Sequence, residues 1–374
     1  MTSFKFGQTR GSALVLCLVL AGPLRAEDRT FSAEGADAAF GLGPRYLAMG
    51  GTGAATADDV YALYYNPANL GGIDRPMVTL GRQVEAVLRP YSFAGVALPL
   101  PFTQAYGFDA TLALARYPRI HAHSTGAFGP DDFESVFLRF LLPGLTGDYD
   151  GTIDSKTMVN RLALGVTLHD LPWLSLGGNV DMIDCRTGTC GVSAGTVYSV
   201  HATAVSYGLS VALRPSDTVT LGLAVSDVST GLTITSVTTD ASGSTTSILQ
   251  SQLPWRVGIE AAWQARSDLL LAVGTQSYRG HYGGYDLVID TLHAGAEWQA
   301  GGPWAVRAGA WAPLRIESGQ FVTPQVIAKA APTLGLGWKK AGVAADLAIL
   351  VHPLDSMHAG RPVVSEEFSL TIQF

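Results

Sequence analysis

From residue 160 to the C-terminus, the chain consists of segments in which apolar and polar residues alternate. In the first segment Leu162, Leu164 and Val166 share one face, while Arg161 and Ala163 lie on the other. An alternation of period two is typical of a β-strand whose two faces meet different surroundings. Eleven segments follow the pattern and three more lie upstream, which predicts fourteen strands. The expected strands are Met77–Val84, Tyr91–Pro99, Gln104–Arg116, Asn160–His169, Trp173–Asp184, Val197–Arg214, Val219–Val228, Pro254–Gln264, Leu269–Gln276, Val288–Trp298, Pro303–Trp311, Pro332–Lys339, Val343–Val351 and Glu366–Phe374.

The connections between these strands alternate in length. Those near residues 171, 216, 266, 300 and 341 are short, and those at 185–196, 229–253, 277–287, 312–331 and 352–365 are long. Short turns on one side and long loops on the other are typical of an outer-membrane barrel, whereas a soluble β-sandwich shares only the alternating faces. Tryptophans near strand ends, where membrane barrels carry aromatic girdles, are Trp255, Trp263, Trp298, Trp304 and Trp338. The predicted fold is all-β, a 14-stranded antiparallel transmembrane β-barrel with an N-terminal plug segment.

The last expected strand ends the chain on an aromatic residue. Phe368, Leu370, Ile372 and Phe374 share one face. A terminal aromatic residue on such a strand resembles the signal recognised by the bacterial outer-membrane assembly machinery, although an ordinary edge strand would look alike. We therefore expect Phe374 to be recognised by that machinery.

The N-terminus has the pattern of a secretory signal peptide. Lys5 and Arg10 precede an apolar stretch over 12–20, and Ala26 is the expected last residue removed. The stretch is shorter than the roughly 20 residues of a membrane-spanning helix. No later segment offers 18 uncharged apolar residues, so entry into a membrane would be by strands. The expected organisation is a signal peptide over 1–26, a plug over 27–76 and a barrel over 77–374 in the bacterial outer membrane.

Composition narrows the partners. Only 15% of the residues are charged, 47% are hydrophobic, and the net charge is −7. Because Lys and Arg form no block, nucleic acid is not an expected partner. The expected partners are outer-membrane lipid and a hydrophobic small-molecule ligand.

Residues 27–76 do not alternate, and their pattern is that of a compact segment. Residues 56–59, Thr-Ala-Asp-Asp, form a capping box that predicts a short helix over 57–64. Asn66 and Pro67 should end it, because the residue before a proline avoids the helical region. A barrel of fourteen strands is too wide for its own side chains to fill. We therefore expect this segment to plug it.

Residues 45–70 read RYLAMGGTGAATADDVYALYYNPANL. The stretch resembles the FadL-type outer-membrane transport superfamily, whose plug has a similar glycine-rich turn, an Ala-Asp pair and an Asn-Pro-Ala element. The resemblance implies a 14-stranded barrel that transports hydrophobic compounds. Its beginning looks even more like the PorV branch, which works in protein secretion. The residues that carry the plug motif are Arg45, Met49, Gly50, Gly51, Asp58, Asp59, Asn66 and Pro67.

Enzyme chemistry has little support in the sequence, and we expect no catalytic residues, no metal and no cofactor. The nearest candidate is His121, His123 and Ser124, but no carboxylate or cysteine completes a metal site nearby in sequence. Charged residues at expected inward positions favour a salt-bridged lining that holds the plug over a charge-selective channel. They are Arg161, Asp181, Arg214, Arg256, Glu260, His293, Glu297, Arg307 and Asp346.

Cys185 and Cys190 remain once Cys17 leaves with the signal peptide. They lie in an expected long loop, and thiols oxidise beyond the inner membrane. Four intervening residues with a glycine can turn back tightly, so we expect a local disulfide. A loop this short would stabilise the fold little.

The longest expected loop, 117–159, contains an apolar helix over 131–142. Its acidic start and Pro143 fit the two ends of a helix. One face carries Phe133, Val136, Phe137, Phe140 and Leu141. Either this face caps the barrel by packing on other loops, or it receives apolar ligands.

The sequence therefore predicts an outer-membrane channel for passive uptake of hydrophobic small molecules, either fatty-acid-like or aromatic. The alternative is a PorV-like barrel that binds secreted or partner proteins, and a third possibility is a purely structural membrane protein. An apolar surface groove leading into the barrel would favour transport, and a sealed barrel with broad exposed loops would favour the partner role.

Overall fold

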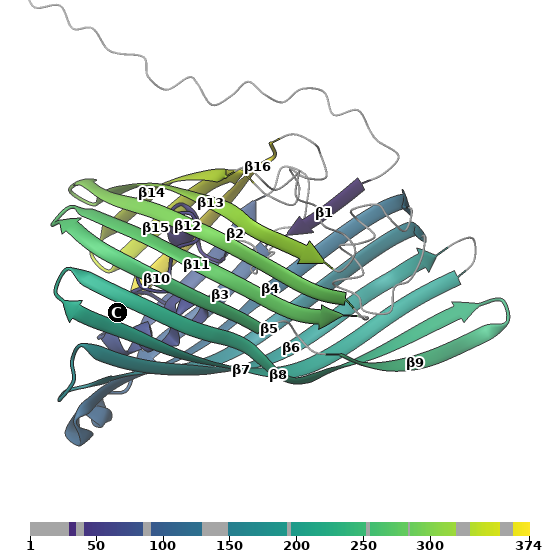
Figure 1. Cartoon of the computed structure of the whole chain (residues 1–374), viewed down its shortest axis with the longest axis horizontal. Coiled ribbons are helices and arrows are strands. Elements are labelled where there is room, and N and C mark those ends of the chain that lie inside the picture. The colour runs from purple at the N-terminus through teal and green to yellow at the C-terminus, as the bar shows by residue number, and fades with distance from the viewer. Residues whose placement is uncertain are drawn as a thin grey trace, which may run out of the picture.

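The structure is a computed structural model, and it describes residues 30–34, 41–84, 91–128, 149–192, 196–251, 255–282, 285–318, 330–351 and 362–374. Fourteen strands close into one antiparallel barrel, which confirms the predicted fold and strand number. Each strand pairs with its sequence neighbour, and β2 pairs with β16 (Val364–Gln373) to close the ring (Figure 1). The other strands are β2 (Met77–Val84), β3 (Tyr91–Pro99), β4 (Phe108–Phe128), β5 (Tyr149–Leu168), β6 (Leu174–Val192), β7 (Thr196–Ser216), β8 (Val219–Asp240), β10 (Trp255–Arg266), β11 (Leu269–Tyr282), β12 (Tyr285–Gly301), β13 (Trp304–Ser318), β14 (Ala331–Lys340) and β15 (Val343–Val351).

Two further strands lie outside the ring. The strand β1 (Thr30–Glu34) adds to β4, and β9 (Gly243–Ser251) folds back on the far half of β8. The resulting β8–β9 ribbon projects beyond the rest of the barrel at the end that carries the long connections (Figure 1). We call this the long-loop end, and the opposite end the tight-turn end.

The strands of the long-loop end are longer than the alternation predicted. The expected loop at 117–159 is too long, because β4 continues to Phe128 and β5 begins at Tyr149. The expected loops at 185–196 and 229–253 are wrong, because β6 continues to Val192, β7 begins at Thr196, and β8 with β9 forms a ribbon. Thr recurs throughout these stretches, and Thr favours strands. Ladder pairing thus continues where the apolar alternation has stopped. The strand expected from Gln104 begins only at Phe108, since the 3-10 helix η2 (Pro101–Tyr106) precedes it.

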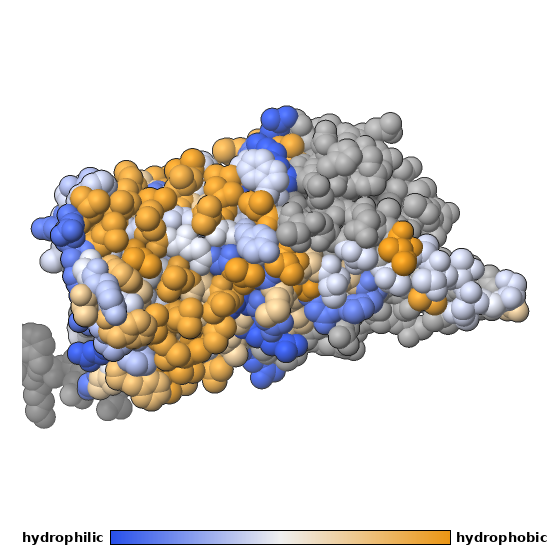
Figure 2. Space-filling model, turned by 90° about the horizontal axis from the view of Figure 1, so that it is seen from below, coloured by the Kyte–Doolittle hydropathy of each residue, from blue (hydrophilic) through white to orange (hydrophobic). Residues whose placement is uncertain are grey.

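The outer face is apolar near the tight turns. Figure 2 shows hydrophobic side chains gathered in a band over that part of the barrel, while the projecting ribbon is mostly polar. Around the tight-turn end Trp173, Trp263, Trp298 and Trp304 are each about half exposed. Trp255 lies at the other end of β10. This arrangement has the form of the apolar band with aromatic girdles that a membrane barrel presents to lipid.

Residues 41–76 lie inside the ring of strands. They contain α2 (Pro44–Leu47), α3 (Ala62–Tyr65) and the 3-10 helix η1 (Pro67–Gly72), and most of their side chains are buried. The segment approaches glycines on strands all around the ring, and only the lumen allows this. A Cβ atom on Gly177 of β6 would lie 2.2 Å from the amide nitrogen of Ala68, and one on Gly309 of β13 would lie 2.2 Å from that of Gly50.

The helix predicted over 57–64 begins later than the capping box indicated. It starts at Ala62 and ends before Asn66, whose extended backbone precedes Pro67 as expected. Thr56 does not cap it, because the Thr56 hydroxyl donates to the carbonyl of Thr52. Asp59 instead accepts a hydrogen bond from the amide of Tyr61, which forms a local turn before the helix. No helix of the described residues is long and apolar enough to span a membrane.

Candidate functional site

The lumen around residues 41–76 is the candidate functional site, and Glu260 makes its most concentrated polar contact. This buried carboxylate on β10 accepts hydrogen bonds from three successive backbone amides, those of Gly53, Ala54 and Ala55, at 2.7, 2.9 and 3.1 Å. Three amides that converge on one anion satisfy donors that no helix or sheet uses. The glycine-rich turn is thereby tied to the barrel wall.

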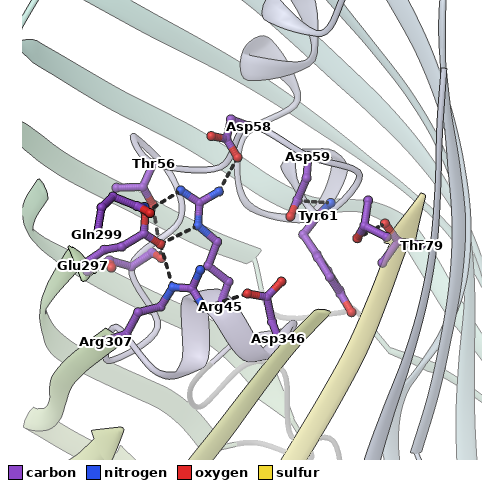
Figure 3. Close-up of polar contacts among 12 residues, drawn as sticks. Arg45, Thr56, Asp58, Asp59, Tyr61, Thr79, Glu297, Gln299, Arg307 and Asp346 are labelled. Carbon is purple, nitrogen blue, oxygen red and sulfur yellow. Dashed lines mark hydrogen bonds and ion pairs between the residues drawn. The ribbon is translucent and has the colours of Figure 1, made fainter. Parts of the chain in front are cut away.

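Arg45 extends from α2 into a network with three strands, shown in Figure 3. Its Nε and Nη2 donate to the two oxygens of Glu297 on β12, at 2.9 and 3.1 Å. Arg307 on β13 shares Glu297 at 2.6 Å and pairs with Asp346 on β15 at 2.7 Å. Arg45 also pairs with Asp58 at the tight-turn side. The predicted salt-bridged lining that contacts the N-terminal segment is therefore present.

The turn at residues 49–51 requires glycine. Gly50 and Gly51 have φ values of 73° and 85°, a region in which residues with a side chain are strained. His293 Nδ1 lies 2.6 Å from the Gly50 carbonyl oxygen, so Nδ1 carries the hydrogen of that bond. Thr333 donates to the carbonyl of Ala48 and accepts from the amide of Gly50. Strands β12 and β14 thus hold this turn by its backbone.

Asn66 joins two parts of the segment to the wall. Its Nδ2 donates to the carbonyls of Ala54 and of Val211 on β7, at 2.7 and 3.0 Å, and its Oδ1 accepts from the amide of Ala68 at 3.1 Å. The residue is fully buried. Pro67 follows at the start of η1, where its carbonyl packs on Gly165 of β5. The Asn-Pro pair therefore directs the chain from α3 along the wall.

An aromatic cluster occupies the other side of the segment. Tyr61 stacks on Phe93 of β3 with ring centroids 4.3 Å apart, and Phe93 lies 6.1 Å from Tyr117 of β4. Tyr64 meets Tyr117 edge-on at 5.9 Å. Tyr46 and Tyr65 complete the group, with centroids 5.1 Å apart. We call these six residues the aromatic cluster: Tyr46, Tyr61, Tyr64, Tyr65, Phe93 and Tyr117.

Two arginines lie over Tyr64. The Arg256 guanidinium lies 4.5 Å from the ring centroid and donates to the hydroxyl, and that of Arg161 lies 5.7 Å from the centroid. Arg161 is fully buried, pairs with Asp181 at 2.6 Å, and donates to the carbonyls of Leu63 and Tyr64. These arginines therefore bind the end of α3 by charge and by cation–π contact.

The described pairings between β3 and β4 end beside the aromatic cluster. The β3–β4 ladder runs from Pro99↔Thr111 to Ala94↔Arg116, the last of the pairings described there. Tyr117 follows at once and pairs with Val159 on the β5 side. Phe93, the β3 residue next to Ala94, pairs with Gly81 on the β2 side. The aromatic cluster therefore faces the point where the described ladder between β3 and β4 ends.

A polar cavity of about 410 Å³ lies at the tight-turn end. Arg45, Asp58, Asp59, Glu297 and Arg307 are among its lining residues. Burial, reinforced by the charge of Asp58, raises the pKa of Asp59 to about 7. The N-terminal segment thus presents a charged surface to this end of the lumen and rings to the β3–β4 side.

Several predicted residues lie where the structure gives no side-chain account. The residues of the expected apolar helix, Phe133, Val136, Phe137, Phe140 and Leu141, are outside the described residues, as is the predicted signal peptide. The backbones of Cys185 and Cys190 lie on β6, so their placement in a loop is wrong, while the disulfide stays a prediction. The backbones of His121 and His123 lie on β4, paired with β1. The described residues contain no group of three or more His, Cys, Asp or Glu side chains suited to a metal ion.

The aromatic cluster was not predicted from the sequence. Tyr61, Tyr64 and Tyr65 recur at the spacing of one helical turn, which was the available signal. Phe93 and Tyr117 looked like ordinary strand residues, because alternation does not say which lumen-facing positions contact the N-terminal segment. The Arg45–Glu297 pair was also missed, since its partners are far apart in sequence.

No protein-family model matches the sequence, and no curated protein matches it. Solved structures do match over most of the chain. The Ralstonia pickettii toluene transporter TbuX gives a TM-score of 0.59 at 15% identity and covers 90% of this chain and 99% of its own. The P. putida toluene transporter TodX gives a TM-score of 0.56 at 14% identity, and the match covers 90% of this chain and 99% of TodX. A Pseudomonas aeruginosa FadL homologue gives a TM-score of 0.59 at 13% identity, and the match covers 88% of this chain and 96% of the homologue. At these identities the likeness shows that the chain has the fold of the FadL-type transporters.

Proposed function

We propose that the chain is an outer-membrane channel through which hydrophobic small molecules, monoaromatic hydrocarbons above all, enter passively. Residues 27–76 act as its plug and residues 77–374 as its barrel. The observation that carries the proposal is the aromatic cluster between the N-terminal segment and the end of the described β3–β4 ladder. Aromatic rings favour edge-to-face and offset contacts with other rings, and such a lining suits an apolar aromatic solute.

Two further observations support a closed path rather than an open pore. The segment is bound to the wall by backbone and charge contacts on several strands, and we expect it to block free passage of ions and water. The solved structures of the same fold include two proteins described as toluene transporters and one described as a monoaromatic hydrocarbon channel, CymD. A PorV-like partner role is not favoured by any contact or comparison among these.

The direct test is uptake of radiolabelled toluene by cells whose only barrel of this fold is the full-length chain. We expect uptake faster than in cells that carry an empty vector, and no increase in the entry of a small hydrophilic dye. Cells that express an open porin at the same level serve as the control for general leakiness. Toluene uptake equal to the empty-vector cells, with correctly assembled protein, would overturn the proposal.

The proposal includes capture at the long-loop end by the apolar helix expected over 131–142. Burial of one Phe side chain stabilises by about 1.5–3 kcal/mol, so three anchors supply at most about 9 kcal/mol, which leaves weak, about millimolar capture after the costs of binding. Changing Phe137 and Phe140 together to Ser should slow toluene uptake and leave the heat stability of the barrel nearly unchanged. Unchanged uptake would assign these side chains to packing between loops.

A further inference from the structure

A second polar contact crosses the lumen away from the N-terminal segment, between Arg119 on β4 and Asp227 on β8. Both residues stand at irregular points of the wall. Arg119 is the extra residue where the β4–β5 register shifts between Pro118 and Ile120. Asp227 has a φ of 65°, and with Ser226 it faces a single residue of β7 where the register shifts. A β-bulge redirects the side chain of its extra residue, and here two bulges direct opposite charges inward.

The contact is bidentate and buried. The two terminal nitrogens of Arg119 each lie 2.9 Å from one oxygen of Asp227, and Nη2 also donates to the hydroxyl of Tyr278 on β11 at 2.6 Å. The side chains of Arg119 and Asp227 are 10% and 3% exposed. Charge-assisted, two-pronged hydrogen bonds of this kind have a fixed geometry as well as strength.

The Arg119–Asp227 ion pair does not join neighbouring strands. Along the ring β5, β6 and β7 separate β4 from β8, and β10 separates β8 from β11. Some other described ion pairs inside the barrel join adjacent strands, as Arg161 and Asp181 do on β5 and β6 and Glu297 and Arg307 on β12 and β13. The Arg119–Asp227–Tyr278 group instead connects three separated parts of the wall, so it lies in the path through the lumen.

Its level along the barrel places it before the aromatic cluster. Ser226 and Tyr278 pair with Arg256, whose guanidinium covers Tyr64, and Asp227 is the next residue of β8 toward the long-loop end. Gly222, which Ala54 contacts, lies nearer the tight turn on the same strand. A solute that enters from the long-loop end therefore meets the Arg119–Asp227 pair before it meets Phe93 and Tyr117.

We propose that Arg119 and Asp227 form a gate across the lumen that sets which hydrophobic solutes reach the aromatic cluster, and how fast. An apolar solute offers neither charge a hydrogen bond, so it passes only when the pair separates. A larger solute requires a wider separation and is slowed more. This inference rests on the proposed function, because it assigns a selectivity step to that same channel.

The test compares uptake of radiolabelled toluene and radiolabelled biphenyl in cells that carry the full-length protein. The variant Arg119→Met keeps most of the side-chain volume and removes the charge, and Asp227→Asn keeps a hydrogen-bonding group. We expect biphenyl uptake to rise about tenfold in Arg119→Met, since the lost bonds are of the charged class, and toluene uptake to rise less. Asp227→Asn should give a smaller change in the same direction.

A matched control is Arg279→Met. Arg279 pairs with Asp290 at 2.9 Å between the adjacent strands β11 and β12, so its loss removes an ion pair without clearing the lumen. The ratio of biphenyl to toluene uptake should stay at the wild-type value in this variant. Assembly of every variant is checked by the shift in gel mobility that folded barrels show on heating.

The outcomes separate the gate from the channel. Failure of the wild-type protein to take up toluene would overturn the proposed function. Uptake by the wild type with an unchanged biphenyl-to-toluene ratio in Arg119→Met and Asp227→Asn would overturn the gate alone. If neither variant assembles, the pair is a strut required for the fold, and the gate is equally overturned.

Discussion

The two sides of the N-terminal segment are held in different ways. Toward β10–β16 the contacts are directional: Glu260 accepts three backbone amides, Glu297 pairs with Arg45, and Glu367 accepts the amide of Gly43 at 3.1 Å. Toward β2–β4 the described contacts are chiefly rings, with Phe93 on Tyr61 at 4.3 Å.

The two kinds of contact should affect the N-terminal segment differently: polar contacts fix its position, and aromatic contacts let it adjust. A hydrogen bond to a charged group contributes about 1.5–3 kcal/mol and is lost when its geometry changes. An aromatic pair contributes about 0.5–1.5 kcal/mol beyond burial and tolerates sliding. The wall formed by β10–β16 can therefore retain the segment while the side facing β2–β4 rearranges around a solute. Variants on the two sides should accordingly fail in different ways.

The largest effect is expected from Glu260→Leu on the anchored side. Three buried amides would lose their acceptor, at about 1–3 kcal/mol each, and the open population of the segment should rise more than about a hundredfold. We expect strong leakage of a hydrophilic dye and larger ion conductance across planar bilayers. Glu366→Leu, an exposed carboxylate on β16, should leave both unchanged. If the Glu260→Leu barrel assembles and shows no more dye leakage or ion conductance than the wild type, retention of the segment does not depend on this anchor.

Phe93→Ala on the aromatic side should affect solute uptake and leave the seal intact. The 2%-exposed ring fills the space between Tyr61 and Tyr117, and its removal opens a path toward the end of the β3–β4 ladder. We expect toluene uptake to rise about tenfold, because the lost packing of a buried Phe is worth about 3–5 kcal/mol and only part of it opposes passage. Dye entry should stay low, since the polar anchors remain. The control is Phe368→Ala, which removes an outward-facing ring.

If Phe93→Ala instead raised dye entry as much as toluene uptake, the two sides would not be distinct. The rings would then retain the segment just as the carboxylates do. Decreased toluene uptake in an assembled variant would identify Phe93 as a binding surface rather than a barrier.

Arg45→Met tests the anchored side at a point where a second arginine partly compensates for the lost hydrogen bonds. Glu297 would lose two hydrogen bonds and keep that from Arg307 at 2.6 Å, so no buried carboxylate is left without a partner. We expect dye entry to rise about fivefold, well below the effect of Glu260→Leu. Arg266→Met, which removes an exposed turn pair with Asp268, should have no effect on the dye. An effect of Arg45→Met equal to that of Glu260→Leu would place the anchor in the Arg45 network instead.

Much of the barrel was predictable because the two faces of each strand can be recognised from the residues of that strand alone. Alternation in a segment such as 160–169 reports one lipid-facing and one lumen-facing side, and Trp263 or Trp298 marks the strand end. Alternation does not show where hydrogen bonding between strands ends. The prediction therefore made β6 and β8 too short at the long-loop end. At η2 the missed signal was Pro101, because proline suits the first turn of a helix.

The candidate site was predictable only in part. Inward charges such as Arg161 and Glu297 follow from strand parity, and Asn66 and Gly50 were marked by the motif. Their partners were not, because a pairing such as Glu260 with the amides of 53–55 depends on the register of a strand some two hundred residues away. The bulges that direct Arg119 and Asp227 inward likewise break the parity on which the prediction rested.

The smallest effect is expected from the pH response of Asp59, which lies between the two sides. Burial and the neighbouring Asp58 raise the pKa of Asp59 from 3.8 to about 7, against the opposing charge of Arg45. The packed segment therefore binds a proton more tightly than the released one does. Its retention should weaken as pH rises from about 4 to about 7 and stay level above that.

The measurement is dye entry across this pH range in the wild type and in Asp59→Asn. We expect a rise of about twofold to threefold in the wild type, because solvent near the mouth screens part of the charge, and a smaller rise in Asp59→Asn. Asp170→Asn, in an exposed turn, should keep the wild-type slope. An undiminished slope in Asp59→Asn would assign the response to other groups. A slope of opposite sign would mean that the ionised carboxylate, through Arg45, retains the segment, and that the anchored side extends to Asp59.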